Sequence, residues 1–320
     1  MSICWLDKLI STSIKIIAMR IKNLLYNTSK AHKHLKIATV AMKCHENPED
    51  NLKKMSNFVK EIKKEHPQVE LIVFGETITG WFFNFEKTAE YHHKIAETIP
   101  GKTTNLMSDL AKNNNLYICF GLNEIKENKY YNSQVLVNPE GEIIAVHRKV
   151  KMRETFFSPG DVLVTIVNIK DIKTGLVICY DVQYKEVNKT LRKSNLELII
   201  HSLADDEDPR EFGIGYLSRS YNAWLINANR YGKEGGHFWN GWLTITNPLG
   251  EICLKGKDKE QYLYYEIGFI KKQKWFAKNL RITYVKIARI VHVIKNIDMA
   301  LATIINRFKV KKEKEKNINK

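Results

Sequence analysis

Two features that carry a chain into a membrane or out of the cell are missing from this sequence. No apolar stretch reaches the ~20 uninterrupted residues that a bilayer-spanning helix needs, and the N-terminus lacks the basic, apolar and small-residue pattern of a cleaved leader. Cysteine is scarce as well. The five cysteines show no Cys-x-x-Cys spacing, and the odd count argues against a disulfide framework. We therefore expect an unexported protein of the reducing cytoplasm.

Acidic residues are few at both ends of the chain, so the net charge of +16 does not describe its middle. Residues 1–34 hold 6 Lys and Arg against 1 acidic residue, and residues 276–320 hold 12 against 3. Residues 35–275 carry the remaining 33 basic and 31 acidic side chains and are nearly neutral. The basic ends also lack the interleaved aromatics that stack on bases, so we expect no nucleic-acid partner.

Both ends have the pattern of an amphipathic helix. In residues 1–34 the apolar side chains recur every three or four positions with lysines on the other side, and residues 285–308 repeat this before a Lys-rich tail. Such helices could dock on the body or on the second subunit of a homodimer, and they could equally make a peripheral contact with the anionic inner membrane surface. The pattern leaves both interpretations open.

The middle of the chain predicts an α/β domain. Residues 35–42 and 69–75 have the composition of strands, and residues 51–64 have the period of a helix, which together make a β-α-β unit. Two later hairpins share the turn sequence Asn-Pro-x-Gly-Glu-Ile, at 138–143 and 247–252. We interpret them as two similar halves of one two-sheet domain. The chain then divides into an N-terminal extension, a central domain and a C-terminal helix with its tail, at 1–34, 35–275 and 276–320.

One stretch passes from a strand to a polar segment at a cysteine. Leu176 to Ile178 form a short β-prone run and residues 183–194 contain little that breaks a helix, so Cys179 is expected at a strand-to-helix elbow. An elbow exposes the thiol, leaves backbone N–H groups for an oxyanion, and offers the positive end of a helix, which lowers the pKa of the thiol. An inert cysteine buried in a strand would have the same sequence.

Two charged residues are predicted at the ends of other strands. Glu76 falls just past the strand 69–75, and Lys149 follows the hairpin strand 141–147. Side chains at the carboxyl ends of strands in α/β sheets often line a site, although solvated charges would look the same in sequence. Glu76, Lys149 and Cys179 are therefore candidates for one site.

These three positions resemble the catalytic blocks of the nitrilase (carbon-nitrogen hydrolase) superfamily, in the same order and 73 and 30 residues apart. The blocks are Phe74-Gly-Glu76, His147-Arg-Lys149 and Ile178-Cys-Tyr-Asp181. Four further segments resemble other blocks of the superfamily and extend the resemblance over about residues 35–270: Phe157-Ser-Pro-Gly160, Asn229-Arg230, Phe238-Trp-Asn-Gly241 and Asn247-Pro-Leu-Gly-Glu251. Because chance matches in the correct order are improbable, we interpret Cys179 as a nucleophile.

The resemblance implies a four-layer α-β-β-α sandwich and a reaction on a small-molecule amide that needs no metal or cofactor. In that reaction Cys179 attacks the amide carbonyl, and Glu76 acts as the general base of both half-reactions. Lys149 and the backbone N–H of Tyr180 hold the oxyanion. Glu154 matches a second glutamate that some relatives place near the nucleophile.

Departures from the family pattern narrow the substrate class. Gly75 replaces the usual proline, which is expected to loosen the backbone before Glu76. The Tyr-Asp after Cys179 resembles the amidase and carbamoylase branches, but Val182 and Gln183 stand where those branches often carry an arginine for a substrate carboxylate. We expect a hydrolase of a small linear amide or N-carbamoyl compound. The alternatives are an inactive module of the same fold that binds a membrane surface or a protein partner, and an acyltransferase that uses the same thioester.

Overall fold

The structure is a computed structural model that describes residues 31–82, 88–152, 154–209 and 211–270. Within them, Lys33–Phe269 forms one compact unit. The amphipathic helices expected near the two ends of the chain lie outside the described residues. In the described ranges no helix combines the length and the apolar character that crossing a membrane requires.

The first of two mixed sheets is built around β1. Strands β1, β2 and β3 run parallel, and β4 and β5 continue the sheet in antiparallel fashion. On its other side β1 pairs first with β13 and then with the second half of β9, which also pairs with β10. The strands are β1 (Lys33–Lys43), β2 (Leu71–Val73), β3 (Tyr117–Lys126), β4 (Lys129–Val137), β5 (Ile143–Arg148), β9 (Trp224–Glu234), β10 (His237–Asn240) and β13 (Gln261–Phe269).

The second sheet starts from the other half of β9. Strands β7, β8 and β9 run parallel, β6 pairs with β7, and the hairpin of β11 and β12 adds on the far side of β9. Strand β9 belongs to both sheets and joins them. The additional strands are β6 (Thr165–Ile169), β7 (Ile172–Ile178), β8 (Leu198–Ser202), β11 (Leu243–Thr246) and β12 (Ile252–Gly256).

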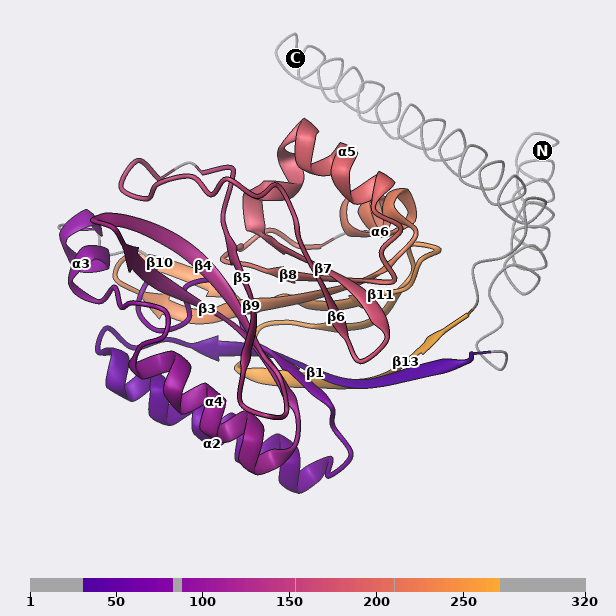
Figure 1. Cartoon of the computed structure of the whole chain (residues 1–320), viewed down its shortest axis with the longest axis horizontal. Coiled ribbons are helices and arrows are strands. Elements are labelled where there is room, and N and C mark those ends of the chain that lie inside the picture. Colours follow the sequence, from indigo (N-terminus) through magenta and orange to yellow (C-terminus); the bar gives the residue numbers. More distant parts are fainter. Residues whose placement is uncertain (1–30, 83–87, 153, 210, 271–320) are drawn as a thin grey trace, which may run out of the picture. The chain divides into compact units, whose positions relative to one another are not determined.

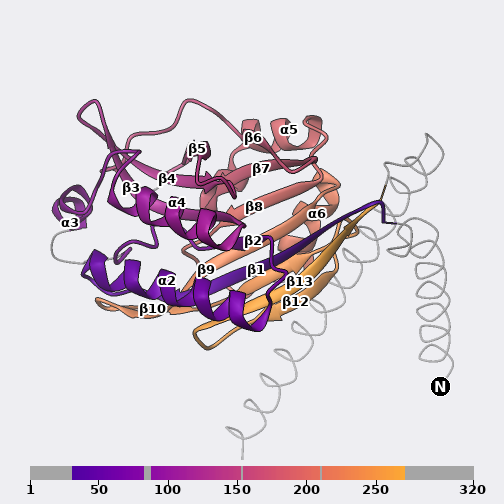
Figure 2. The same cartoon turned by 60° about the horizontal axis from the view of Figure 1, so that its bottom comes forward.

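Helices cover the outer face of each sheet. Figure 1 shows α2 and α4 on one side of the strands and α5 and α6 on the opposite side, and the turned view of Figure 2 agrees. This arrangement confirms the predicted four-layer α-β-β-α sandwich. The helices are α2 (Pro48–Glu65), α3 (Thr88–Lys94), α4 (Lys102–Asn114), α5 (Lys185–Lys193) and α6 (Tyr216–Tyr221).

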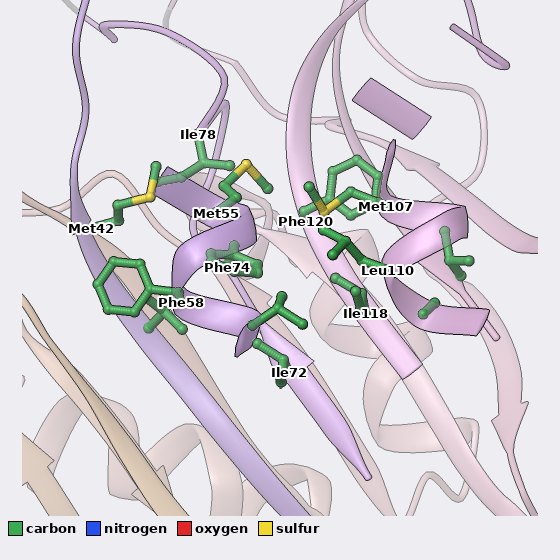
Figure 3. Packing of buried hydrophobic residues seen from close by; sticks show 14 of the residues in the cluster. Met42, Met55, Phe58, Ile72, Phe74, Ile78, Met107, Leu110, Ile118 and Phe120 are labelled. Atoms are coloured by element: carbon green, nitrogen blue, oxygen red, sulfur yellow. The ribbon is translucent and has the colours of Figure 1, made fainter. Parts of the chain in front are cut away.

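The layer between the first sheet and its helices is an apolar core. Helix α2 begins after Asn47, whose side-chain oxygen accepts the Glu49 N–H at 3.1 Å, and its predicted apolar face is buried. Each such side chain stabilises the fold by about 1.5–3 kcal/mol when it leaves water. Figure 3 shows the α2 and α4 side chains against those of β1 to β3 and the loops that follow β2, among them Met42, Met55, Phe58, Ile72, Phe74, Ile78, Met107, Leu110, Ile118 and Phe120.

Polar side chains bridge the two sheets where they face each other. Gln134 in β4 donates to the Ser202 hydroxyl in β8 at 2.7 Å, and Ser202 donates to the Phe74 carbonyl at 3.1 Å. All three residues are buried. Buried hydrogen bonds of this kind fix the offset of one sheet on the other, because a slip would leave their polar atoms without partners.

The repeated turn of the two hairpins has the same hydrogen bonds in both copies. The Asn138 side-chain oxygen accepts the N–H groups of Glu140 and Glu142, and Asn247 accepts those of Leu249 and Glu251 in the same way. In each turn the asparagine amide also donates to the glutamate four residues later, at 2.9 Å and 2.8 Å. The resemblance of the two halves, expected from the sequence, therefore extends to atomic detail at the turns.

The structure contains strands that the sequence analysis did not predict. Strand β13 pairs with β1 over nine residues, but mainly its last three residues are buried, so it shows no clean alternation. Strands β6 and β10 are short edge segments that were also missed. The sequence from Pro209 to Tyr221 also has the composition of one helix, but the structure forms a π-turn at Glu211–Gly215 followed by the six-residue α6. Gly215 in this π-turn lies so close to Gly250 that a Cβ on Gly215 would clash with the carbonyl oxygen of Gly250.

Candidate active site

Cys179 lies at the elbow that the sequence predicts, although the turn is tighter than expected. It follows β7 directly and begins a short 3-10 turn, Cys179–Gln183, and α5 starts only at Lys185 after an extended Tyr184. Its φ of +39° is rare for any residue other than glycine. A strained backbone of this kind at the end of a strand turns the side chain out of the strand, and the Cys179 thiol is half-buried there.

Glu76 is fully buried and its carboxylate is held by three donors. Oε1 accepts Lys149 Nζ at 2.7 Å and Asn132 Nδ2 at 2.7 Å, and Oε2 accepts the Ala204 N–H at 3.0 Å. Three donors fix the plane of the carboxylate, so Glu76 offers its remaining lone pair in one direction. The local sequence around Glu76 contains no signal for Asn132 or Ala204, which are 56 and 128 residues away.

The structure brings all four predicted side chains together. Lys149 Nζ lies 3.6 Å from Glu154 Oε2 as well as 2.7 Å from Glu76. The Cys179 Sγ lies 4.0 Å from the carbonyl oxygen of Ala204, whose N–H binds Glu76, so the thiol and the carboxylate share one neighbour. Lys149 is 2 % exposed and the Glu154 side chain 15 % exposed, which leaves Glu154 the more accessible of the two.

The expected lowering of the thiol pKa is wrong. Burial and the negative charge of Glu76 raise the pKa of Cys179 well above its ordinary value of 9.0, and the Lys149 ammonium opposes them only in part. The single turn that follows Cys179 is too short to supply a helix dipole that outweighs these effects. Cys179 therefore rests as a thiol, and it would need a base beside it to react as a nucleophile.

Glu76 has the electrostatics of that base. Burial raises the pKa of Glu76 above 4.5, although the Lys149 ammonium works in the opposite direction. Burial alone would lower the pKa of Lys149, but the charges of Glu76, Cys179 and Glu154 reverse the shift and raise it. Lys149 thus stays an ammonium, and Glu76 is a stronger proton acceptor than an exposed carboxylate.

Gly75 lies where two other backbone segments approach Glu76. A Cβ on Gly75 would come within 2.9 Å of the Asn229 carbonyl carbon and 3.1 Å of the Leu203 carbonyl oxygen. The expectation that this glycine loosens the backbone is therefore wrong, since the close packing confines it. Glycine here permits the contact between the segment after β2, the middle of β9 and the segment after β8.

We expect Gly75→Ala to lower the free energy of unfolding by about 1–3 kcal/mol, because the backbone atoms that the new methyl meets cannot swing aside. Gly213→Ala is the matched control, since a Cβ there would meet nothing within 4 Å. Urea denaturation of both variants measures the difference. Equal stability of the two variants would show that the segment around Gly75 can yield.

Arg230 supports the Glu76 segment from behind, a role that the sequence analysis did not assign. The fully buried guanidinium donates to the carbonyl oxygens of Glu76 at 2.7 Å and Thr77 at 2.9 Å, and also binds that of Gly80. Its charge is paired with the buried Glu234 at 2.8 Å. One side chain thus fixes three carbonyls of the loop that carries the base.

The two positions after Cys179 at which the sequence lacks an arginine point to different surroundings. Val182 is buried in the core against α5, and Gln183 is exposed. Neither side chain is a cation that could bind a substrate carboxylate. Tyr180 is half-buried directly after the thiol. Asp181 is fully buried and binds the segment after β5. In the sequence Asp181 stands out only as part of the Ile178-Cys-Tyr-Asp181 motif, which predicts no contact for it.

Within the described residues, no group of three or more His, Cys, Asp or Glu side chains could hold a metal ion. Beside Cys179 the Lys149 ammonium contacts two carboxylates, those of Glu76 and Glu154, and this arrangement can move protons and stabilise a negative oxygen. The geometry suits attack by a thiol on a carbonyl carbon.

Comparisons with known proteins point to one family. The family model described as carbon-nitrogen hydrolase matches residues 36–269. A nitrilase from Pyrococcus abyssi is 31 % identical over 242 residues, 73 % of this chain and 88 % of the relative, and an omega-amidase from Homo sapiens is 25 % identical over 74 % and 89 %. The crystal structure of Nit3 from Saccharomyces cerevisiae, a member of branch 10 of the nitrilase superfamily, has a TM-score of 0.66 at 20 % identity, with 76 % of this chain and 92 % of Nit3 covered.

Proposed function

The chain belongs to the carbon-nitrogen hydrolase family, and from this we propose that it hydrolyses small linear amides at Cys179 through a thioester, with Glu76 and Lys149 completing a catalytic triad. The observation that carries the proposal is the buried contact of Glu76 with Lys149, next to a thiol whose pKa is raised. A thiol that rests protonated reacts only if a base removes its proton at the moment of attack, and Glu76 is that base.

In the first half-reaction the Glu76 carboxylate takes the Cys179 proton as the sulfur forms a bond to the amide carbon. The carbonyl π electrons move to oxygen, and the Lys149 ammonium and the backbone N–H of Tyr180 hold the resulting oxyanion. Glu76 then passes the proton to the amide nitrogen, the C–N bond breaks, and ammonia or an amine leaves. A thioester on Cys179 remains.

In the second half-reaction Glu76 takes a proton from a water molecule as the water oxygen attacks the thioester. The C–S bond breaks, the carboxylic acid leaves, and Glu76 returns the proton to the sulfur. Glu154 lies 3.6 Å from Lys149 on the more exposed side of the triad, where its charge keeps Lys149 protonated and where it can orient the amide nitrogen. One buried carboxylate thus serves both steps.

The charge around the thiol supports a substrate without a carboxylate. Glu76 and Asp205 both raise the pKa of Cys179, and Glu154 adds a third negative charge beside Lys149. The Lys149 ammonium contacts Glu76 and Glu154. A substrate carboxylate near the thiol would therefore meet repulsion of about 1–4 kcal/mol per charge pair at close range.

A matched pair of amides tests the proposal. Butyramide and succinamate have four carbon atoms each, and succinamate carries a carboxylate where butyramide has a methyl group. We expect ammonia release from butyramide with a kcat/KM at least about tenfold higher, since 1.4 kcal/mol corresponds to a factor of ten. An N-carbamoyl amine and a nitrile complete the panel, and Cys179→Ala is the blank.

Absence of ammonia release from every compound would contradict the proposed function and favour the inactive module. A preference for succinamate would contradict the assigned substrate class alone. Product that forms only when a second amine is present would identify an acyltransferase, because both reactions pass through the same thioester.

The pH dependence of kcat/KM should follow Glu76. Glu76 must be ionised to act, so we expect activity to rise with pH through a midpoint above 4.5, in line with the raised pKa of this group. Asn132 donates to Glu76 Oε1 and lowers its pKa, so Asn132→Leu should move the acid limb to still higher pH. An acid limb that stays in place in Asn132→Leu would exclude Glu76 as the titrating group.

We also propose that the enzyme acts in the cytoplasm as a homodimer, with a central domain at 35–275 between two basic extensions that touch an anionic membrane surface. The scattered cysteines support the compartment, since four of the five are free thiols in the described residues. The charge of the extensions, 6 basic against 1 acidic and 12 against 3, supports the peripheral contact.

A further inference from the structure

The Asp181 carboxylate is the centre of a buried hydrogen-bond cluster next to the nucleophile. Its Oδ1 accepts the N–H groups of Val150 and Lys151, both at 2.8 Å. Its Oδ2 accepts the Ile178 N–H at 3.0 Å and His147 Nε2 at 3.1 Å. The carboxylate is 0 % exposed, and four donors occupy the four lone-pair directions that it has.

These four donors come from the two segments that carry the triad's ammonium and thiol. His147, Val150 and Lys151 flank Lys149 on both sides, and Ile178 directly precedes Cys179. Lys149 itself makes no contact with Asp181 that would compete with its bond to Glu76. Asp181 is therefore placed to set the distance between the loop after β5 and the elbow after β7.

A carboxylate is well suited to this position. An amide or a hydroxyl cannot accept four hydrogen bonds, and hydrogen bonds to an ionised acceptor are about twice as strong as neutral ones. His147 is itself fully buried, and its Nδ1 lies 3.1 Å from the Thr165 hydroxyl, so its ring is held on both sides. The cluster reaches from β5 through the elbow to β6.

We propose that Asp181 is a positioning residue that holds the Lys149 ammonium at the place where the oxyanion develops on attack by Cys179, with His147 as its buttress. This inference rests on the proposed function and adds a role that concerns one step, stabilisation of the oxyanion. Displacement of such a donor by about 1 Å lowers a rate about 10²-fold, as does loss of one oxyanion donor.

Asp181→Asn tests the inference because it keeps the size of the side chain. Asn accepts at one oxygen and turns its NH₂ group toward the donors that Oδ2 accepted, so the two segments must shift. We expect kcat for butyramide to fall about 10²-fold with KM changed less than threefold. The free energy of unfolding is measured in parallel by urea denaturation.

A second reaction at the same sulfur separates positioning from general damage. Methyl methanethiosulfonate transfers a CH₃S group to the Cys179 sulfur, the thiol proton goes to Glu76, and methanesulfinate leaves. No carbonyl oxygen becomes negative, so the reaction does not need Lys149 in the oxyanion position. We expect the rate of this thiolation, followed by mass spectrometry, to change less than fivefold in Asp181→Asn.

Glu124→Gln is the matched control. Glu124 is a buried carboxylate, 2 % exposed, that accepts from Ser133 and Arg148 and touches neither Lys149 nor Cys179. A loss of stability like that of Asp181→Asn with kcat within threefold of wild type supports the inference. If Glu124→Gln loses kcat equally, or if thiolation and hydrolysis fall together in Asp181→Asn, Asp181 has only a structural role.

A pair of variants at His147 provides the test if Asp181→Asn does not fold. Glutamine can place an NH₂ group near the position of His147 Nε2, whereas leucine cannot donate. We expect His147→Leu to lower kcat about tenfold and His147→Gln to stay within threefold of wild type. Equal rates in the two variants would overturn the inference. A wild-type protein that hydrolyses no amide would instead refute the proposed function.

Discussion

Glu76→Gln is expected to lower kcat for amide hydrolysis about 10⁴-fold, the upper end of what a general base contributes. Glutamine cannot take the Cys179 proton, and the pKa of this thiol is raised, so little thiolate forms without the base. The amide would also present an NH₂ group to one of three donors, Lys149, Asn132 or Ala204. Ammonia release in steady state and in a single turnover measures the loss.

Glu154→Gln is the matched comparison for Glu76→Gln. Glu154 lies 3.6 Å from Lys149 and is the more exposed carboxylate, so its loss should lower kcat by about 10-fold to 100-fold only. Because one base serves both half-reactions, Glu76→Gln should slow formation and hydrolysis of the thioester alike, so the fraction of thioester in steady state, measured by intact mass, should not rise above that of wild type. A kcat within tenfold of wild type in Glu76→Gln would assign the base to another group.

The largest loss of stability is expected from Arg230→Met. The variant leaves the Glu234 carboxylate without its guanidinium and removes the donor from three buried carbonyls of the Glu76 segment. Removal of one partner from a buried ion pair costs about 3–5 kcal/mol. Chemical denaturation measures this loss, and kcat should fall with it because the loop that carries Glu76 is released.

Two further variants show whether the loss comes from burial of the ion pair. Lys102→Met breaks an ion pair with Glu49 in which both side chains are more than half exposed, and it should cost less than about 1 kcal/mol. Arg230→Met combined with Glu234→Gln should lose less than the two single changes together, since no buried charge is left unpaired. A stability of Arg230→Met within 1 kcal/mol of wild type would mean that water reaches Glu234.

The residues that we propose as catalytic could be selected from the sequence because each follows a local pattern. Glu76, Lys149 and Cys179 stand after apolar β-prone runs, at the carboxyl ends of strands in the two facing sheets, where site residues often lie. The helix α2 was predictable for a similar reason, since a period of 3.6 residues identifies its buried face. Such signals are contained in ten to twenty consecutive residues.

The residues that hold the catalytic groups were not predictable in the same way. Asn132 and Ala204 bind Glu76 across 56 and 128 residues of chain, and Arg230 binds its carbonyl across 154. Asp181 is two residues from the nucleophile, yet its donors in the loop after β5 come from 30 residues away. No period or turn signal in a single sequence links such positions.

The sequence by itself determined the strands and helices that have a clear period, such as β1, α2 and β7, and that a carboxylate, an ammonium and a thiol stand at strand ends. Only the tertiary structure decided that the carboxylate and the ammonium touch, that Gly75 is confined by the backbones of Asn229 and Leu203, and that the thiol pKa rises. The physical reason is that periodicity and turn chemistry are local. Desolvation, close approach of backbones and the field at a buried sulfur are sums over atoms from distant parts of the chain.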